Sequence, residues 1–401
     1  MINGLVVVKI IAMYVGPSGL AFIGQFQNFL AILMSFATGA INSGVVKYTA
    51  EHREDELEKQ KLWSTAIRIS LGATFFTSLM LIAFHNYLST LFFKTDEYGS
   101  IFLIFAVTLV FFALNSLLLA ILNGQKEIKK LITVGIVSSF VGLILTGGLT
   151  YYFGLYGALL SYTTGQGLVF FVTLGFVFKS QWFKVKLFTE KLDSEYLKKL
   201  GKYTAMAITS ALTVPLSQII VRNYIGESLS WNDAGYWEAI WKISSTYLMV
   251  VTATLSIYYL PRLSEIKDKI ELRNEIFYGY KIIMPIVVVL ALGIYFFRDY
   301  AILLLFTEDF TPMKELFLYQ LIGDVFKIAS WLLGYLMIAK AMTRIFIITE
   351  IGASLSFIVL SILLVKTFGL IGVTMAFALN YFVYFMVMIF IFRHTLRKPY
   401  E

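Results

Sequence analysis

The sequence contains no cysteine and few charged or proline residues. The absence of cysteine from all 401 residues excludes a disulfide framework and a thiolate metal site, but it leaves the cellular compartment open. Charged residues make up 14% of the chain, against about 25% in an ordinary soluble domain, and only 6 prolines interrupt it. P-loop, dinucleotide-binding and HExxH motifs are missing, and the three histidines lie far apart in the sequence. These absences argue against an enzyme and against a bound metal.

The sequence instead contains long apolar segments. Hydrophobic residues make up 58% of the chain, and apolar runs of about 20 residues, long enough to cross a bilayer as helices, recur along it. The runs are continuously apolar, whereas barrel strands would alternate over about 10 residues. We therefore predict an all-α polytopic membrane protein. Its twelve expected spans are 1–15, 20–46, 63–86, 100–122, 131–153, 157–179, 203–224, 236–260, 280–297, 316–340, 344–366 and 371–392.

Positive charge predicts the orientation of these spans. If the loop at 47–62 is cytoplasmic, the loops and tail on that side carry 24 Lys and Arg residues and the opposite side carries five. Lys and Arg accumulate on the cytoplasmic side of membrane proteins, so both termini are expected in the cytoplasm. The net charge of +8 then reflects topology and contact with anionic membrane lipids. Nothing in its distribution indicates a nucleic-acid-binding face.

An internal repeat predicts two similar halves. "FGLYG" at 153–157 is matched by "FGLIG" at 368–372, 215 residues later, and both suit a tight turn between antiparallel helices. Three further weak matches share nearly the same offset. Because each half has six spans, the halves have the same orientation, which is a transporter design with a central cleft between them. The predicted divisions are a bundle at 1–179, a cytoplasmic linker at 180–202, a bundle at 203–392 and a cytoplasmic tail at 393–401. The repeat also predicts that the first helix is truncated at its N-terminus.

Charged side chains within the spans are the first candidates for function. Each costs about 2.5–3.5 kcal/mol at the centre of a membrane helix, so it is retained for a reason. The excess of cations over acids predicts a positively charged cavity. The cations are Lys9, Arg68, Arg222, Lys242 and Lys327, and the acids are Glu238, Asp324 and Glu350.

Span 316–340 carries the most central of these charges. Asp324 and Lys327 are three residues apart and share a helix face with Gln320 and Trp331. One interpretation is a polar stripe that lines a wet cavity, because charge facing lipid is not tolerated at that depth. The alternative is a self-neutralising pair with a structural role.

Two further spans carry polar stripes. Glu238 and Lys242 lie on one face of span 236–260, and Gln25, Asn28 and Asn42 lie on one face of span 20–46. These stripes predict that both helices border the cleft. Hydrogen bonding between packed helices would produce the same pattern.

The remaining charges have competing interpretations. Lys9 and Arg222 lie in spans related by the repeat, and so are expected to be a symmetric pair of cavity cations or structural groups. Arg68 lies close enough to the end of its span to extend its side chain to the membrane surface. Glu350, a lone acid, and Asp324 are candidates for coupling transport to H⁺ or Na⁺; the alternative for Glu350 is a structural acid held by hydrogen bonds.

Three segments resemble a known family. They are "YVGPSGLAFIGQFQN" at 14–28, "SWNDAGYWEAIWKISSTYLMVVTATLSIYYLPRLSE" at 230–265 and "LLFTEDFTPMKELFLYQLIGDVFKIASWLLGYLMIAKA" at 304–341. They are similar to the Wzx-type flippases, in particular the translocases of O-antigen and of enterobacterial common antigen lipid III, and the resemblance runs along nearly the whole chain. It implies membership of the multidrug/oligosaccharidyl-lipid/polysaccharide exporter superfamily, with twelve helices in two bundles.

The resemblance also implies a function. Members of the family move an undecaprenyl-pyrophosphate-linked oligosaccharide from the cytoplasmic to the periplasmic leaflet of the bacterial inner membrane by alternating access. They have a cationic cavity and no catalytic residues, and ion coupling is proposed for some. A polysaccharide polymerase and a chain-length regulator are the implied protein partners.

Two other functions compete with this one. A multidrug cation antiporter of the same superfamily would need an acidic and aromatic site, whereas the predicted interior is positive. A membrane glycosyltransferase or polymerase would need a large loop with catalytic carboxylates, and the longest predicted loop has only about 24 residues.

Overall fold

The computed structural model describes residues 2–396, apart from the side chains of residues 2, 202, 203, 205 and 206. Within that part of the chain the secondary structure is helical and no strand is present. The first half consists of α1 (Ile2–Ala37), α2 (Asn42–Glu51), α3 (Glu56–Phe93), α4 (Gly99–Gly124), α5 (Ile128–Phe178), η1 (Val185–Phe188) and α6 (Ser194–Ser228). The second consists of α7 (Trp231–Thr254), the π-helical turn η2 (Leu255–Tyr259), α8 (Leu260–Glu265), α9 (Lys269–Phe296), α10 (Arg298–Leu305), η3 (Glu308–Leu316), α11 (Phe317–Ala339), α12 (Thr343–Phe368), α13 (Ile371–Ile391) and α14 (Arg393–Leu396).

The prediction of an all-helical polytopic membrane protein is confirmed. Among the described residues, nine helices are long and apolar enough to cross a membrane. Two of them, α1 and α5, each contain two predicted spans, because the backbone leaves the helical conformation at Gly16 and at Gly154. Helix α6 covers the predicted span at 203–224.

One predicted span ends earlier than expected. The second part of α1 stops at Ala37, and Gly39 and Ala40 adopt positive φ angles of 65° and 52°. Asn42 therefore starts the separate helix α2 and does not continue the polar face of Gln25 and Asn28. Periodicity alone did not reveal this break, because the residues on both sides of it are compatible with a helix.

The repeated turn is present in both halves. Gly154 and Gly369, 215 residues apart, have φ angles of 55° and 63°, a region that glycine enters without steric cost. Three residues further on, a Cβ atom on Gly157 would lie 1.9 Å from Leu149 O, and one on Gly372 would lie 2.1 Å from Leu364 O. Only glycine therefore lets the second helix of each pair approach the carbonyl of the first.

Alanine at Gly157 is expected to destabilise the protein. The added methyl group would displace backbone, and overpacking of this kind costs about 1–3 kcal/mol. Gly148→Ala in the same helix is the matched control, because a Cβ there meets nothing within 4 Å. We expect a lower apparent Tm in detergent for Gly157→Ala and an unchanged or slightly higher one for Gly148→Ala. Equal values for the two variants would contradict the close approach.

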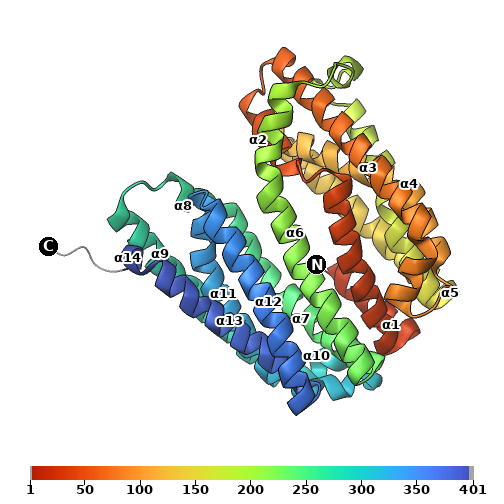
Figure 1. The fold of residues 1–401 in the computed structure, drawn as a ribbon, viewed down its shortest axis with the longest axis vertical. Helices are drawn as coiled ribbons and strands as arrows, with labels where there is room; N and C mark the ends of the chain where they lie inside the picture. The colour runs from red at the N-terminus through yellow and green to blue at the C-terminus, as the bar shows by residue number, and fades with distance from the viewer. Residues whose placement is uncertain (1, 397–401) are drawn as a thin grey trace. The chain divides into compact units, whose positions relative to one another are not determined.

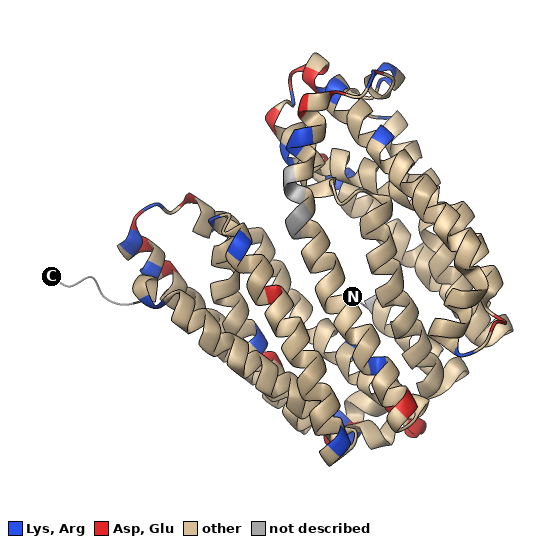
Figure 2. Ribbon diagram, viewed as in Figure 1, with Lys and Arg blue, Asp and Glu red and all other residues tan. Residues whose placement is uncertain are grey.

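By contacts, the chain divides into two compact units. Unit 1 comprises residues 1–15 and 22–215, and unit 2 comprises residues 16–21 and 216–401. The predicted linker at 180–202 lies within unit 1, and part of the predicted tail, 397–401, lies outside the described residues. Helix α4 packs against α3 and α5 in unit 1, and α11 packs against α7, α9 and α13 in unit 2 (Figure 1). In each unit the charged residues gather near the helix ends, with few between them (Figure 2).

Candidate functional site

Lys327 occupies an aromatic site within unit 2. It lies on α11 and is 9% exposed. Its Nζ atom lies 4.9 Å from the ring centre of Trp331, 5.1 Å from that of Trp241 and 6.0 Å from that of Tyr381. The negative faces of aromatic rings attract a cation, and the attraction is strongest where water is excluded. The three rings come from α11, α7 and α13, so the packing of these helices creates the site.

Asp324 lies one turn before Lys327 and is fully buried. Its Oδ2 atom accepts a hydrogen bond of 2.8 Å from the Tyr247 hydroxyl on α7. The side chains of Ser244 and Gln320 lie beside the carboxyl group without the geometry of hydrogen bonds. In the part of the chain that the structure describes, Asp324 and Lys327 do not form an ion pair within 4 Å. The lysine contacts aromatic rings instead, and the aspartate contacts a tyrosine.

A second cluster joins α6 to α7. Arg222 is 1% exposed, and its guanidinium group donates a hydrogen bond to Glu238 Oε2. The other carboxylate oxygen, Oε1, lies 3.2 Å from Lys242 Nζ. Arg222 also lies over the ring of Trp237, 5.4 Å from its centre. Glu238 therefore binds one buried cation and one cation whose side chain is 27% exposed.

The remaining acid of unit 2 has a tyrosine partner. Tyr384 on α13 donates a hydrogen bond of 3.2 Å to Glu350 Oε1 on α12. The predicted site residues of unit 2 are balanced in charge, since the three cations Arg222, Lys242 and Lys327 stand against the three acids Glu238, Asp324 and Glu350. The predicted excess of cations comes from residues of unit 1.

The predicted site residues of unit 1 have different surroundings. Gln25 is buried, while Asn28 and Lys9 are partly buried on α1. Asn42 donates a hydrogen bond of 2.7 Å to Ser116 on α4, so it joins two helices of that unit. Arg68 is exposed and donates through Nε to the backbone oxygen of Glu190, 2.9 Å away. Arg68 is thus bonded to the segment that connects α5 and α6.

Sequence reasoning missed the aromatic partners of the charges. Trp241, Tyr247, Tyr381 and Tyr384 surround the lysine and the two acids, yet none of them was a candidate. The hydroxyl group of a Tyr or the N–H group of a Trp within a membrane span indicates such partners, because a polar group there needs a hydrogen-bond partner. Trp331 was found, since it lies one turn after Lys327 on the same helix.

The arrangement is suited to binding. Lysine side chains near aromatic rings can contact an anionic group. Among the residues that the structure describes, no group of three His, Asp or Glu side chains could hold a metal ion.

Comparison with known proteins decides the family. A model of the family described as "Polysaccharide biosynthesis protein" matches residues 26–315. The lipid III flippase of Escherichia coli K12 is 30% identical over 383 residues, which cover 95% of this chain and 92% of that protein. The lipid III flippase of Shigella flexneri matches with the same identity and coverage. The chain belongs to the polysaccharide biosynthesis protein family.

Solved structures confirm the fold of this family member. A multidrug resistance transporter of the MATE family in an inward-facing conformation matches with a TM-score of 0.83 and 14% identity, over 98% of this chain and 94% of the other. The lipid II flippase MurJ in an inward closed conformation matches with a TM-score of 0.73 and 18% identity, over 98% and 85% of the two chains. At these identities the likeness concerns the fold alone.

Proposed function

We propose that this protein moves an undecaprenyl-pyrophosphate-linked oligosaccharide, an O-antigen or common-antigen repeat unit, from the cytoplasmic to the periplasmic leaflet. The observation that carries the proposal is the 30% identity to lipid III flippases over 95% of the chain. The lysines and polar groups of unit 2 support it, because pyrophosphate is anionic and sugars form hydrogen bonds. The polyprenyl tail can stay in lipid, so the site needs to contact only the head group.

Two lysines are suited to bind the pyrophosphate. Lys242 can exchange Glu238 for a phosphate oxygen, while Arg222 keeps the Glu238 carboxylate neutralised. Lys327 can exchange contacts with ring faces for a charge-assisted hydrogen bond, which is the stronger interaction. Release in the other leaflet reverses both exchanges, so no covalent step is needed.

The location, coupling and partners belong to the same proposal. We place the protein in the bacterial inner membrane with both termini in the cytoplasm, on the charge distribution of its loops. Asp324 and Glu350, each of which accepts a hydrogen bond from a tyrosine, are the candidates for coupling to H⁺ or Na⁺. A polysaccharide polymerase and a chain-length regulator would act on the transported glycan next.

Reconstitution tests the proposal. We expect proteoliposomes containing this protein to expose nearly all of a fluorescent undecaprenyl-pyrophosphate oligosaccharide to dithionite, whereas protein-free vesicles should expose only the outer-leaflet half. Ethidium efflux from the same vesicles tests the competing function, a multidrug cation antiporter. Efflux without exposure of the glycan lipid would overturn the flippase and favour the antiporter.

The orientation can be tested separately because the native chain lacks cysteine. Lys198→Cys reports on the predicted cytoplasmic side, and Leu229→Cys reports on the predicted periplasmic loop; both positions are exposed. Leu229 is preferred to Ser230, whose hydroxyl accepts a hydrogen bond from Asp233 N and caps α7. In spheroplasts we expect an impermeant maleimide to label position 229 and to leave position 198 unmodified until the membrane is broken. The reverse pattern would overturn the orientation.

A further inference from the structure

The segment between α5 and α6 is bound tightly to α3. We call residues 179–193 the strap; it contains η1. Gln60 Nε2 donates to Lys186 O at 3.2 Å, and Arg68 Nε donates to Glu190 O at 2.9 Å. Ser64 binds the backbone twice, donating to Leu187 O at 3.2 Å and accepting from Glu190 N at 3.0 Å. Side chains from successive turns of α3 thus satisfy the backbone of an otherwise irregular segment, which fixes its position.

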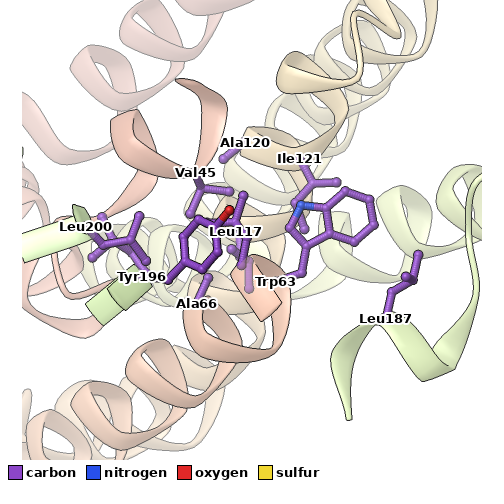
Figure 3. Close-up of a cluster of buried hydrophobic side chains, with 11 residues drawn as sticks. Val45, Trp63, Ala66, Leu117, Ala120, Ile121, Leu187, Tyr196 and Leu200 are labelled. Atoms are coloured by element: carbon purple, nitrogen blue, oxygen red, sulfur yellow. The ribbon is translucent and has the colours of Figure 1, made fainter. Parts of the chain in front are cut away.

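Apolar packing fixes the inner face of the strap as well. Leu187 is 4% exposed and belongs to the same buried cluster as Trp63 (Figure 3). The ring of Phe188 stacks on that of Trp63, with 5.5 Å between the ring centres. Trp182 packs edge-on against Trp63 at 5.2 Å, and its Nε1 atom donates to Glu127 Oε1. The strap is therefore a rigid part of unit 1 with one buried face and one outward face.

Helix α6 holds the far end of the strap. Asp193 N donates to Thr65 Oγ1 at 2.9 Å, and the buried Tyr196 donates its hydroxyl hydrogen to Glu58 Oε2 at 2.6 Å. Burial, helped by the Glu58 carboxylate, raises the pKa of Tyr196, so the phenol stays protonated and keeps donating at physiological pH. Both ends of the outward face are therefore held in place.

The outward face combines exposed apolar and basic side chains. Val185 is 64% exposed and Leu192 is 47% exposed, and the preceding residue of α5, Phe178, is 58% exposed. The lysines at 179, 186 and 191 are exposed, and each is next to one of these apolar residues in the sequence. Lys184 is also exposed but is paired with Glu56 at 2.6 Å. Apolar side chains next to lysines are typical of segments that lie in the headgroup layer of a membrane.

We infer that the outward face of the strap binds the anionic phospholipid surface of the cytoplasmic leaflet. The strap directly follows α5, which is long and apolar enough to cross a membrane, so its first residues lie next to the end of a candidate span. The lysines can contact lipid phosphates while Phe178, Val185 and Leu192 enter the boundary of the acyl chains. This inference concerns the bilayer and is independent of the transported molecule.

Site-directed spin labelling of the full chain in nanodiscs tests the inference. The native chain has no cysteine, so Val185→Cys, Leu192→Cys and Glu54→Cys each give one label site. Glu54 is an exposed residue in the turn between α2 and α3 of the same unit and serves as the control. In nanodiscs containing phosphatidylglycerol we expect labels at 185 and 192 to be several-fold more accessible to oxygen than to a water-soluble nickel chelate. The label at 54 should show the opposite preference.

Two further experiments test whether the strap binds the membrane through the negative charge of the lipids or only lies close to the bilayer. In nanodiscs of phosphatidylcholine alone, the labels at 185 and 192 should become more accessible to nickel. The double change Lys186→Glu and Lys191→Glu should do the same in anionic nanodiscs, whereas Lys186→Arg with Lys191→Arg should not, and size-exclusion profiles check that both variants are folded. The inference is overturned if positions 185 and 192 are as accessible to nickel as position 54. It is also overturned if their contact with lipid is the same in both nanodiscs.

Discussion

Lys327→Ala is expected to abolish transport of the glycan lipid. A hydrogen bond to a charged group contributes about 1.5–3 kcal/mol, and its loss corresponds to roughly 10- to 150-fold weaker binding. Lys327 is largely buried among ring faces, so solvent screens its charge only weakly. Surface glycan and the accumulated lipid-linked intermediate should be measured together in cells, normalised to protein abundance. Lys366→Ala, at an exposed lysine near the end of α12, is the matched control and should transport normally.

Two further variants test whether Lys327 binds the substrate or only neutralises Asp324. Lys327→Arg should keep part of the transport, because the charge remains while its shape and hydration change. Asp324→Asn combined with Lys327→Ala should not restore transport, since the aspartate is bonded to Tyr247 and not to the lysine. Full transport by the double variant would show that the two residues form a structural pair, and it would exclude Lys327 from substrate binding.

Glu238→Ala is expected to cause the largest loss of stability. The change leaves Arg222, which is 1% exposed, without the carboxylate that neutralises it. Removing one partner of a buried ion pair costs about 3–5 kcal/mol, because the other charge stays desolvated. We expect a markedly lower apparent Tm in detergent and a reduced amount of protein in the membrane. Glu315→Ala, at an exposed acid of the same unit, should leave both unchanged.

Removing both charges should recover most of this loss. Glu238→Leu with Arg222→Met places apolar side chains where the pair was, and such replacements of buried pairs are often neutral or stabilising. If the double variant is as unstable as Glu238→Ala, the loss comes from packing and not from the buried charge. Transport by the double variant is a separate measurement, which reports whether Lys242 still functions without its partner Glu238.

The sequence by itself determined the membrane class, the spans and the repeated turn. Continuous apolar runs can only be satisfied as helices in lipid, and a turn that needs positive φ and a close approach requires glycine at fixed positions. Gly154 and Gly369 were therefore predictable from two short matching segments. The early end of α1 at Ala37 was not, because nothing in the local pattern forbids a longer helix there.

Only the tertiary structure decided the partner of each charge. Spacing along α11 places Asp324 and Lys327 on one face, but the groups they contact come from α7 and α13, which are far away in the sequence. Likewise, the sequence left open whether Arg222 is a cavity cation or a structural group, and only the packing of α6 against α7 showed that Glu238 is its partner. Helical periodicity fixes the direction of a side chain from its own helix, whereas its neighbours depend on how the helices pack. Burial makes those neighbours matter most, because a charge that is removed from water must be stabilised by whatever the packing supplies.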